Sequence, residues 1–135
     1  MTHESLETGQ EISHPVGRTI TEHDDTLFSL MSMNQHPVHI DANYAAATQH
    51  GQRLVVGPLV IAIVIGISEA MFGGRATVTL EYRDIKHVRP VFHGDTIYAR
   101  SRVLSRTESE VTIASEGLNQ RGEVVLSLER RVELR

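Results

Sequence analysis

The sequence predicts an α+β domain in which a curved antiparallel sheet wraps around one central apolar helix. Residues 54–72 form the most apolar stretch of the chain, with no charge from Leu54 to Ile67. An element that is apolar on every side has to be surrounded by other elements. Residues 77–132 show instead the two-residue alternation of half-buried strands. A sheet with one apolar face needs a cover, and the apolar stretch is the element suited to provide it.

Length favours a helix for the apolar stretch, since buried strands usually run for about 4–8 residues. Gly57 is expected as its N-cap and Pro58 in its first turn, where a missing N–H costs nothing. The Gly73-Gly74 pair is expected to end it. Two buried strands broken at Gly66 are the alternative. The stretch is too short to span a bilayer, which needs about 20 apolar residues.

The N-terminal part of the chain is expected to form a tail, a weak strand and a helix. Residues 1–9 are polar and predict a flexible tail, and a strand is expected within residues 10–20. Thr21 and Asp24 have the spacing of a capping box, so a helix should follow and end near Met33. Its inward face is expected to consist of Leu27, Phe28, Leu30 and Met31.

Residues 34–41 predict an irregular loop before the apolar helix. Asp41 at its end is a candidate N-cap for a second short helix over residues 42–49. Tyr44 and Ala45 are expected to face inward from that helix.

The second half predicts long antiparallel strands joined by short loops, the last three forming a meander. The exposed edge of so small a sheet invites pairing with a second copy, so we expect a homodimer or a higher symmetric oligomer. The residues expected on the apolar faces of successive strands are Val78, Leu80 and Tyr82; Ile97, Ala99 and Val103; Val111, Ile113, Ser115 and Gly117; and Val124, Leu126, Leu128 and Val132.

Composition limits the classes of function. The 135 residues suit a single domain, residues 1–135, and a net charge of −4 without a basic block argues against a nucleic-acid-binding surface. There is no cysteine, which excludes disulfides and a thiol nucleophile. The N-terminus has no apolar signal region, so we expect a cytoplasmic protein that does not enter a membrane. No metal or other cofactor is expected, since no metal-like spacing is found for six of the eight histidines, which are His3, His14, His23, His50, His87 and His93.

Three short segments carry a resemblance to a known family. Asn34-x-His36-Pro37-x-His39-x-Asp41, followed by Val56-Gly57-Pro58 and later by Pro90-Val-Phe-x-Gly94-Asp95-Thr96, resembles the signature of MaoC-like (R)-specific enoyl-CoA hydratases and dehydratases. The similarity covers about residues 10–133. That family has the hot-dog fold, a curved sheet around a central helix. Residues 25–34 further resemble the subgroup that acts on mesaconyl-, itaconyl- or methylmalyl-CoA.

The resemblance implies reversible hydration of a short enoyl-CoA, with coenzyme A present only as part of the substrate, and the subgroup resemblance implies a branched or dicarboxylic acyl group. His39 matches the family histidine and is the candidate acid/base, because histidine titrates near neutrality. Gly57 matches the position whose N–H binds the thioester oxygen, which suits a helix N-terminus. Asn34 stands where the family has its catalytic Asp, and His36 where it has Asn. Asn34 is expected to position the attacking water.

Further residues are expected to bind the substrate, and two other functions stay open. The expected substrate-binding residues are His36, Val55, Val56 and Pro58. Because Asn34 replaces the family acid, a non-catalytic acyl-CoA-binding protein or partner subunit is the first alternative. A hot-dog thioesterase is the second, but its carboxylate would have to be Glu69, about 18 Å of helix rise from Gly57.

Overall fold

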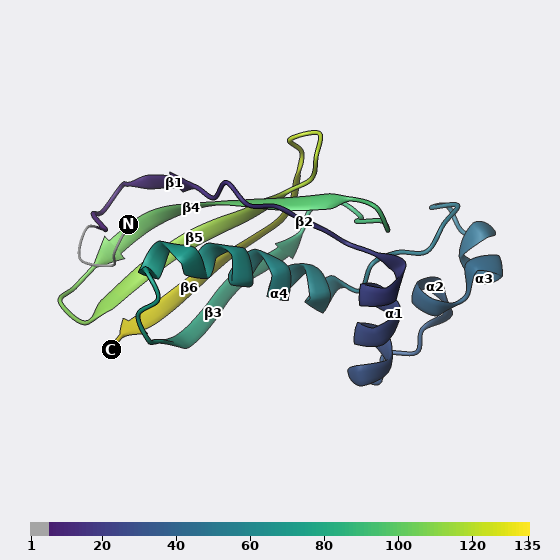
Figure 1. The fold of residues 1–135 in the computed structure, drawn as a ribbon, viewed down its shortest axis with the longest axis horizontal. Coiled ribbons are helices and arrows are strands. Elements are labelled where there is room, and N and C mark those ends of the chain that lie inside the picture. Colours follow the sequence, from purple (N-terminus) through teal and green to yellow (C-terminus); the bar gives the residue numbers. More distant parts are fainter. Residues whose placement is uncertain (1–5) are drawn as a thin grey trace.

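The computed structural model describes residues 6–135. Figure 1 shows helix α4 lying along the concave face of a curved sheet, with α1, α2 and α3 gathered beyond its N-terminal end. The strands are β1 (Glu11–Ser13), β2 (Arg18–Thr19), β3 (Thr77–His87), β4 (Thr96–Arg106), β5 (Glu110–Leu118) and β6 (Val124–Leu134). The helices are α1 (Glu22–Met31), α2 (Pro37–Ile40), α3 (Ala42–Ala46), α4 (Gly57–Ser68) and the 3₁₀ helix η2 (Glu69–Phe72). The predicted α+β architecture is confirmed.

The sheet has the strand order β1-β4-β5-β6-β3, with β2 also paired to β4, and its neighbouring strands are antiparallel. Strands β4, β5 and β6 form the expected meander. Strand β3 precedes them in sequence but pairs with β6, which leaves β3 at one edge. Within residues 6–135, no helix combines the length and apolar character that crossing a bilayer requires.

Helix α4 follows the prediction except at its first residue. Val56 is the N-cap, and Gly57 is the first helical residue. Val60, Val64 and Ser68 are buried at four-residue intervals, so this face lies on the sheet. The α-helix itself ends at Ser68, and the 3₁₀ helix η2 continues to Phe72. Gly73 then ends the helical segment as predicted, in the left-handed conformation with φ 61°.

Helix α1 begins as predicted but buries the opposite face. Thr21 and Asp24 form the expected capping box. The expectation that its apolar residues face the core is wrong for Leu27, Leu30 and Met31, which are exposed. Asp25 and Ser29 are the buried residues of α1. The reason is the hydrogen bond from the Val56 N–H, which holds the carboxylate of Asp25 inward.

In β3, as in α1, apolar residues expected to face the core are exposed. Leu80 and Tyr82 were expected on the apolar face, but they are 40% and 51% exposed. Thr79 opposes buried Val132 of β6, and the register then shifts between Thr79 and Glu81. A bulge of this kind changes which side chains face the core.

Two smaller expectations also changed. Leu6 and Gly9 were expected in a flexible tail, but Leu6 is 1% exposed in a core cluster and the Gly9 N–H donates to the Val103 carbonyl. Residues 1–5 lie outside the described residues. Helix α3 is shorter than expected, and Tyr44 is exposed while Ala45 is buried. The loop before it contains the short helix α2.

Candidate active site

His39 lies on α2, a single helical turn whose N-cap is His36. The His36 ring nitrogen Nδ1 accepts the Val38 N–H at 3.1 Å, and Pro37 occupies the first turn. His39 Nδ1 is 2.8 Å from the carbonyl oxygen of Leu54. Because a carbonyl oxygen only accepts, the proton of a neutral His39 resides on Nδ1. The Nε2 nitrogen is left as the basic atom, which is the form a general base requires.

Asn34 and His36 lie next to His39. The His36 and His39 ring centroids are 6.1 Å apart and meet edge to face. The Asn34 side-chain oxygen accepts the His36 N–H at 3.3 Å, and the Asn34 N–H donates to the Ser29 carbonyl. The structure therefore brings together three of the residues predicted from the sequence. The Asn34 side-chain NH2 has no partner in the described part of the chain, so it is available to a water molecule or a ligand.

The segment that leads into α4 connects His39 to Gly57. The Leu54 N–H donates to the Val38 carbonyl, which ties this segment to α2. Among residues 6–135, the Gly57 N–H has no acceptor. An unpaired N–H at the positive end of a helix suits a developing negative charge.

The predicted substrate-binding residues have different environments. Pro58 and His36 are exposed, whereas Val55 and Val56 are buried at 6% and 1% exposure. Val55 belongs to the larger core cluster around α4. Contact of any of the four with an acyl group stays a prediction.

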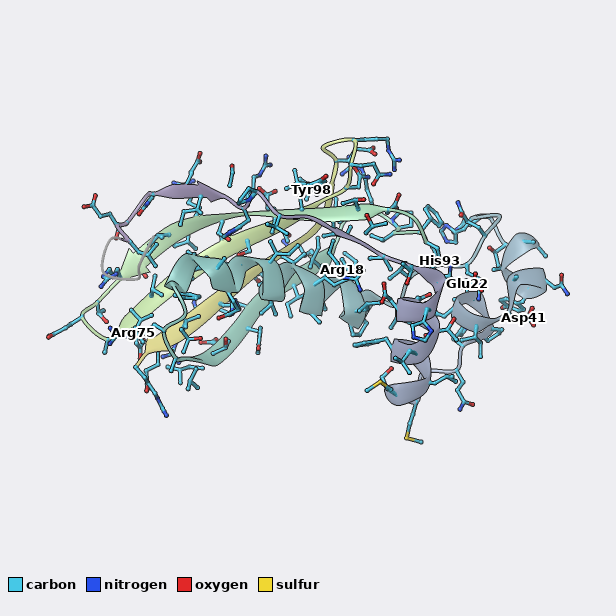
Figure 2. The ribbon with its side chains drawn as sticks, viewed as in Figure 1. Arg18, Glu22, Asp41, Arg75, His93 and Tyr98 are labelled. Atoms are coloured by element: carbon cyan, nitrogen blue, oxygen red, sulfur yellow. The ribbon has the colours of Figure 1, made fainter. Side chains whose placement is uncertain are left out.

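A buried carboxylate next to this segment was missed in the sequence. Asp25 is completely buried. Its Oδ1 accepts the Val56 N–H at 2.9 Å, and its Oδ2 is 2.6 Å from His93 Nε2. Figure 2 shows His93 and Glu22 near α1, beyond the N-terminal end of α4. The sequence signal was the i, i+4 pair Asp25 and Ser29, which form one side of α1, opposite the apolar residues.

Arg53 reinforces this region from the surface. It forms an ion pair with Glu22 at the start of α1. The hydrogen bond from Arg53, followed by its positive charge, holds the pKa of Glu22 below its usual range. The pair joins the first turn of α1 to the segment before α4.

A second missed histidine, His87, lies against Gly57. A Cβ atom placed on Gly57 would be 2.9 Å from both Cε1 and Nε2 of the His87 ring. His87 is the last residue of β3, 30 positions further along the chain. Sequence spacing gives no signal for such a contact.

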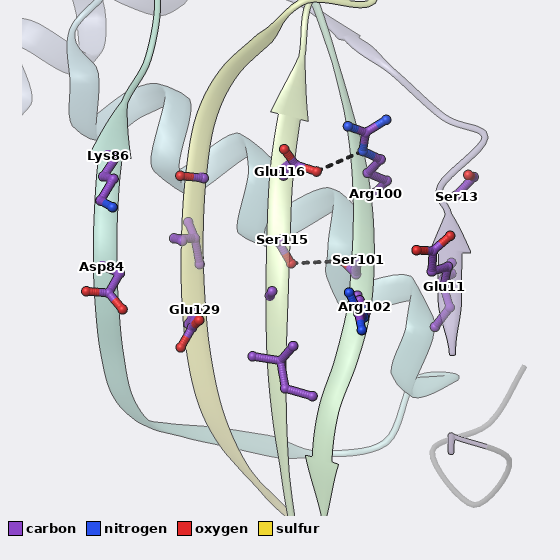
Figure 3. Close-up of a pocket in the computed structure, with 15 residues that line it drawn as sticks. Glu11, Ser13, Asp84, Lys86, Arg100, Ser101, Arg102, Ser115, Glu116 and Glu129 are labelled. Carbon is purple, nitrogen blue, oxygen red and sulfur yellow. Dashed lines mark hydrogen bonds and ion pairs between the residues drawn. The ribbon is translucent and has the colours of Figure 1, made fainter. Parts of the chain in front are cut away.

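A cavity of about 550 Å³ lies elsewhere, on strands of the sheet (Figure 3). Its lining includes Arg100, Glu116 and Glu129, and Arg100 forms an ion pair with Glu116 at 2.9 Å. None of the predicted site residues lines it. The candidate active site is therefore built from the α2 turn and the N-terminus of α4, and not from this cavity.

Glu69, the carboxylate that a thioesterase would need, already has two partners within the protein. It forms an ion pair at 2.7 Å with buried Arg130 and accepts a hydrogen bond from Thr77. A carboxylate held by a buried guanidinium is a poor nucleophile or base. This contact weighs against the thioesterase alternative.

A family model described as "MaoC like domain" matches residues 4–123. The chain belongs to this family. The resemblance proposed from the sequence is thus confirmed, and residues 34–58, which carried most of it, lie within the matched range of this MaoC-like domain.

Two relatives of this chain are named as hydratases of CoA thioesters. The MaoC-like chain is 29% identical to mesaconyl-CoA hydratase of Cereibacter sphaeroides, over 98% of this chain and 40% of that protein. It is 25% identical to an (R)-specific enoyl-CoA hydratase of Aeromonas caviae over 99% of both chains. It therefore spans less than half of the first relative and nearly all of the second.

A solved structure agrees with the fold. The unliganded R-hydratase of Pseudomonas aeruginosa aligns with a TM-score of 0.86 and 31% identity, over 98% of this chain and 84% of that one. The predicted hot-dog fold is confirmed.

Proposed function

We propose that this MaoC-like domain catalyses the reversible addition of water to a short enoyl-CoA, with His39 as the acid/base. The observation that carries the proposal is the hydrogen bond from His39 Nδ1 to the Leu54 carbonyl, because it leaves Nε2 as a base near the start of α4. The hydratase names of the relatives support the reaction class.

The proposed reaction needs one proton carrier and one anion stabiliser. His39 Nε2 removes a proton from water as the water oxygen bonds to C3 of the enoyl group. The electron pair of the double bond moves toward the thioester, and the Gly57 N–H stabilises the negative oxygen. Protonated His39 then returns the proton to C2, so that H and OH have been added. The Asn34 amide orients the water, and the reverse sequence is dehydration.

We further propose a short branched or dicarboxylic acyl group as the substrate, supported by the similarity to mesaconyl-CoA hydratase. Purified protein incubated with crotonyl-CoA and mesaconyl-CoA is expected to consume the conjugated thioester, followed by its ultraviolet absorbance. His39→Ala should lower kcat by about 10²–10⁴-fold. His23→Ala, which removes an exposed histidine of α1, is the matched control and should leave kcat unchanged. Turnover of His39→Ala at the rate of the parent protein would refute the role of His39.

The non-catalytic alternative rests on Asn34 in place of the family Asp. Asn34→Asp separates the two functions, since it restores a titratable group at the same position. If the parent protein is inactive on every enoyl-CoA tested and Asn34→Asp is active, this chain is a binding protein or a partner subunit.

We also propose assembly as a symmetric homodimer or a multiple of it. Strand β3 is at the sheet edge, and Leu80, Tyr82, Ile85 and Val88 are 40–51% exposed. An apolar edge of this length favours pairing with a second copy. Sedimentation equilibrium should give at least a dimer. Tyr82→Lys, which places a charge on that edge, should weaken the association, and a monomeric parent protein would refute the proposal.

A further inference from the structure

The His87 imidazole occupies the space that glycine leaves open at position 57. A Cβ atom at Gly57 would approach the Cε1 and Nε2 atoms of His87 to 2.9 Å, closer than real Cβ contacts allow. The edge of the ring that carries Nε2 therefore faces the first residue of α4. Absence of a side chain at position 57 is what permits this approach.

The backbone of His87 is held by the sheet and not by a loop. His87 opposes Leu126 of β6, which is completely buried, and the next N–H, that of Val88, donates to the Val125 carbonyl at 2.8 Å. Opposed residues of paired strands point to the same face of a sheet. His87 is thus directed to the face that carries α4, where Gly57 lies.

Neither group has a protein partner. Within residues 6–135, no hydrogen bond or ion pair involves the His87 ring, and the Gly57 N–H has no acceptor. His87 is exposed, so its ring is open to solvent and to a ligand. Two hydrogen-bonding groups without a protein partner, from elements distant in sequence, therefore lie next to each other at the start of α4. A ligand atom that accepts two hydrogen bonds would bind both groups at once. A carbonyl oxygen can do this because it has two lone pairs.

We propose that His87 is a further catalytic residue, whose Nε2–H donates a second hydrogen bond to the thioester oxygen beside the Gly57 N–H. The inference rests on the proposed hydratase function. His87 transfers no proton in this role. It stabilises the negative charge that the oxygen acquires when water adds to C3 and that disappears when C2 is protonated. Oxyanion sites act through such preorganised donors.

Ligand binding tests the contact without requiring turnover. The probes are butyryl-CoA, a saturated thioester, and S-butyl-CoA, in which a CH₂ group replaces the carbonyl. By calorimetry, His87→Ala should weaken butyryl-CoA binding about fivefold, the value of one hydrogen bond, and leave S-butyl-CoA binding unchanged. Equal changes for both ligands, or no change for either, would overturn the proposal.

Kinetics separates a hydrogen-bond donor from a packing role. With the best enoyl-CoA of the panel, His87→Ala should lower kcat/KM about 10²-fold, mainly through kcat. His87→Asn keeps a side-chain N–H donor and should recover part of that loss, whereas His87→Leu keeps bulk without a donor and should not. Equal activity of the Asn and Leu variants would contradict donation by His87.

The contact with Gly57 gives an independent check. In the parent protein, Gly57→Ala should displace the His87 ring and lower kcat/KM to about the level of His87→Ala. In the His87→Ala background the same methyl group meets no ring, so a further decrease of less than about threefold is expected. Fully additive losses would overturn the proposal. If the parent protein hydrates no enoyl-CoA, the proposed function fails, and the two binding probes still decide whether His87 contacts a thioester carbonyl.

Discussion

Asp25 and His93 meet inside the protein, with His93 Nε2 2.6 Å from one carboxylate oxygen of Asp25. The other oxygen accepts the Val56 N–H, one residue before the first residue of α4. Asp25 is on α1 and His93 is between β3 and β4. One buried carboxylate therefore fixes the start of α4, and with it the direction of the Gly57 N–H, relative to two other parts of the fold.

Removing that carboxylate should destabilise the protein. Asp25→Ala leaves the buried Val56 N–H and the partly buried His93 ring without their acceptor, and we expect the free energy of unfolding to fall by about 3 kcal/mol. Urea denaturation measures this. Asp24→Asn, a change at the neighbouring carboxylate that retains an oxygen acceptor for its capping box, should cost less than about 1 kcal/mol. A similar cost for both variants would contradict the positioning role of Asp25.

The buried Arg130 should depend on its carboxylate partner. Its guanidinium is 2.7 Å from Glu69 and 2.9 Å from the Ser68 hydroxyl, and the residue is 1% exposed. Glu69→Ala removes the only ion-pair partner found for Arg130 among residues 6–135, and we expect a loss of about 3 kcal/mol. Arg130→Met in the Glu69→Ala background should recover most of it, because the uncompensated buried charge is gone. No recovery in the double variant would show that the charge was not the cause.

Two glycines should respond oppositely to alanine. A Cβ at Gly117 would be 2.6 Å from Val64 Cγ2 in the core, whereas one at Gly66 meets nothing within 4 Å. Gly117→Ala should cost about 1–3 kcal/mol by overpacking. Gly66→Ala, within helix α4, should stabilise the chain by about 0.5–1 kcal/mol. Thermal and urea unfolding measure both, and a stabilising Gly117→Ala would contradict the close approach of α4 to β5.

His14 should make stability sensitive to acid. It is buried against the hydroxyl of Ser101, which in turn contacts that of Ser115, and burial lowers the pKa of His14. The folded state thus binds this proton less well than the unfolded chain does. Above about pH 7, His14 should add no pH dependence to the free energy of unfolding. It should decrease as the pH falls below about 6.5, by at most about 1.4 kcal/mol per pH unit.

His14→Gln is the variant that isolates this contribution. The difference in unfolding free energy between parent and variant should be constant above pH 7 and should shift in favour of the variant between pH 6.5 and 5. A difference independent of pH over that range would show that His14 titrates alike in both states.

The elements that the sequence determined are those governed by local chemistry. The Thr21–Asp24 capping box, the Asp41 cap, the glycine after η2 and the alternation of β4 and β5 all depend on residues close together in the chain. The Asn34–Asp41 motif likewise placed Asn34, His36 and His39 together, since a short loop cannot separate them.

The exposed sides of α1 and β3 required the tertiary structure. Periodicity places Leu27 and Leu30 on one side of α1, but it does not say which side meets the protein. The buried hydrogen bond of Asp25 to Val56 decides that, and it joins residues 31 positions apart. The bulge in β3 likewise depends on pairing with β6, whose opposed residues lie 50 or more positions further along the chain.

The sequence alone therefore determined the fold class, the family and the half of the candidate site contributed by residues 34–58. Only the tertiary structure added Asp25, His93 and His87. Asp25 and His87 reach the start of α4 from distant elements, and His93 is joined to it through Asp25. Spatial contacts of that kind depend on strand pairing and helix packing, which no local pattern encodes. The site at Gly57 is thus a product of the whole fold, although its first half was visible in the sequence.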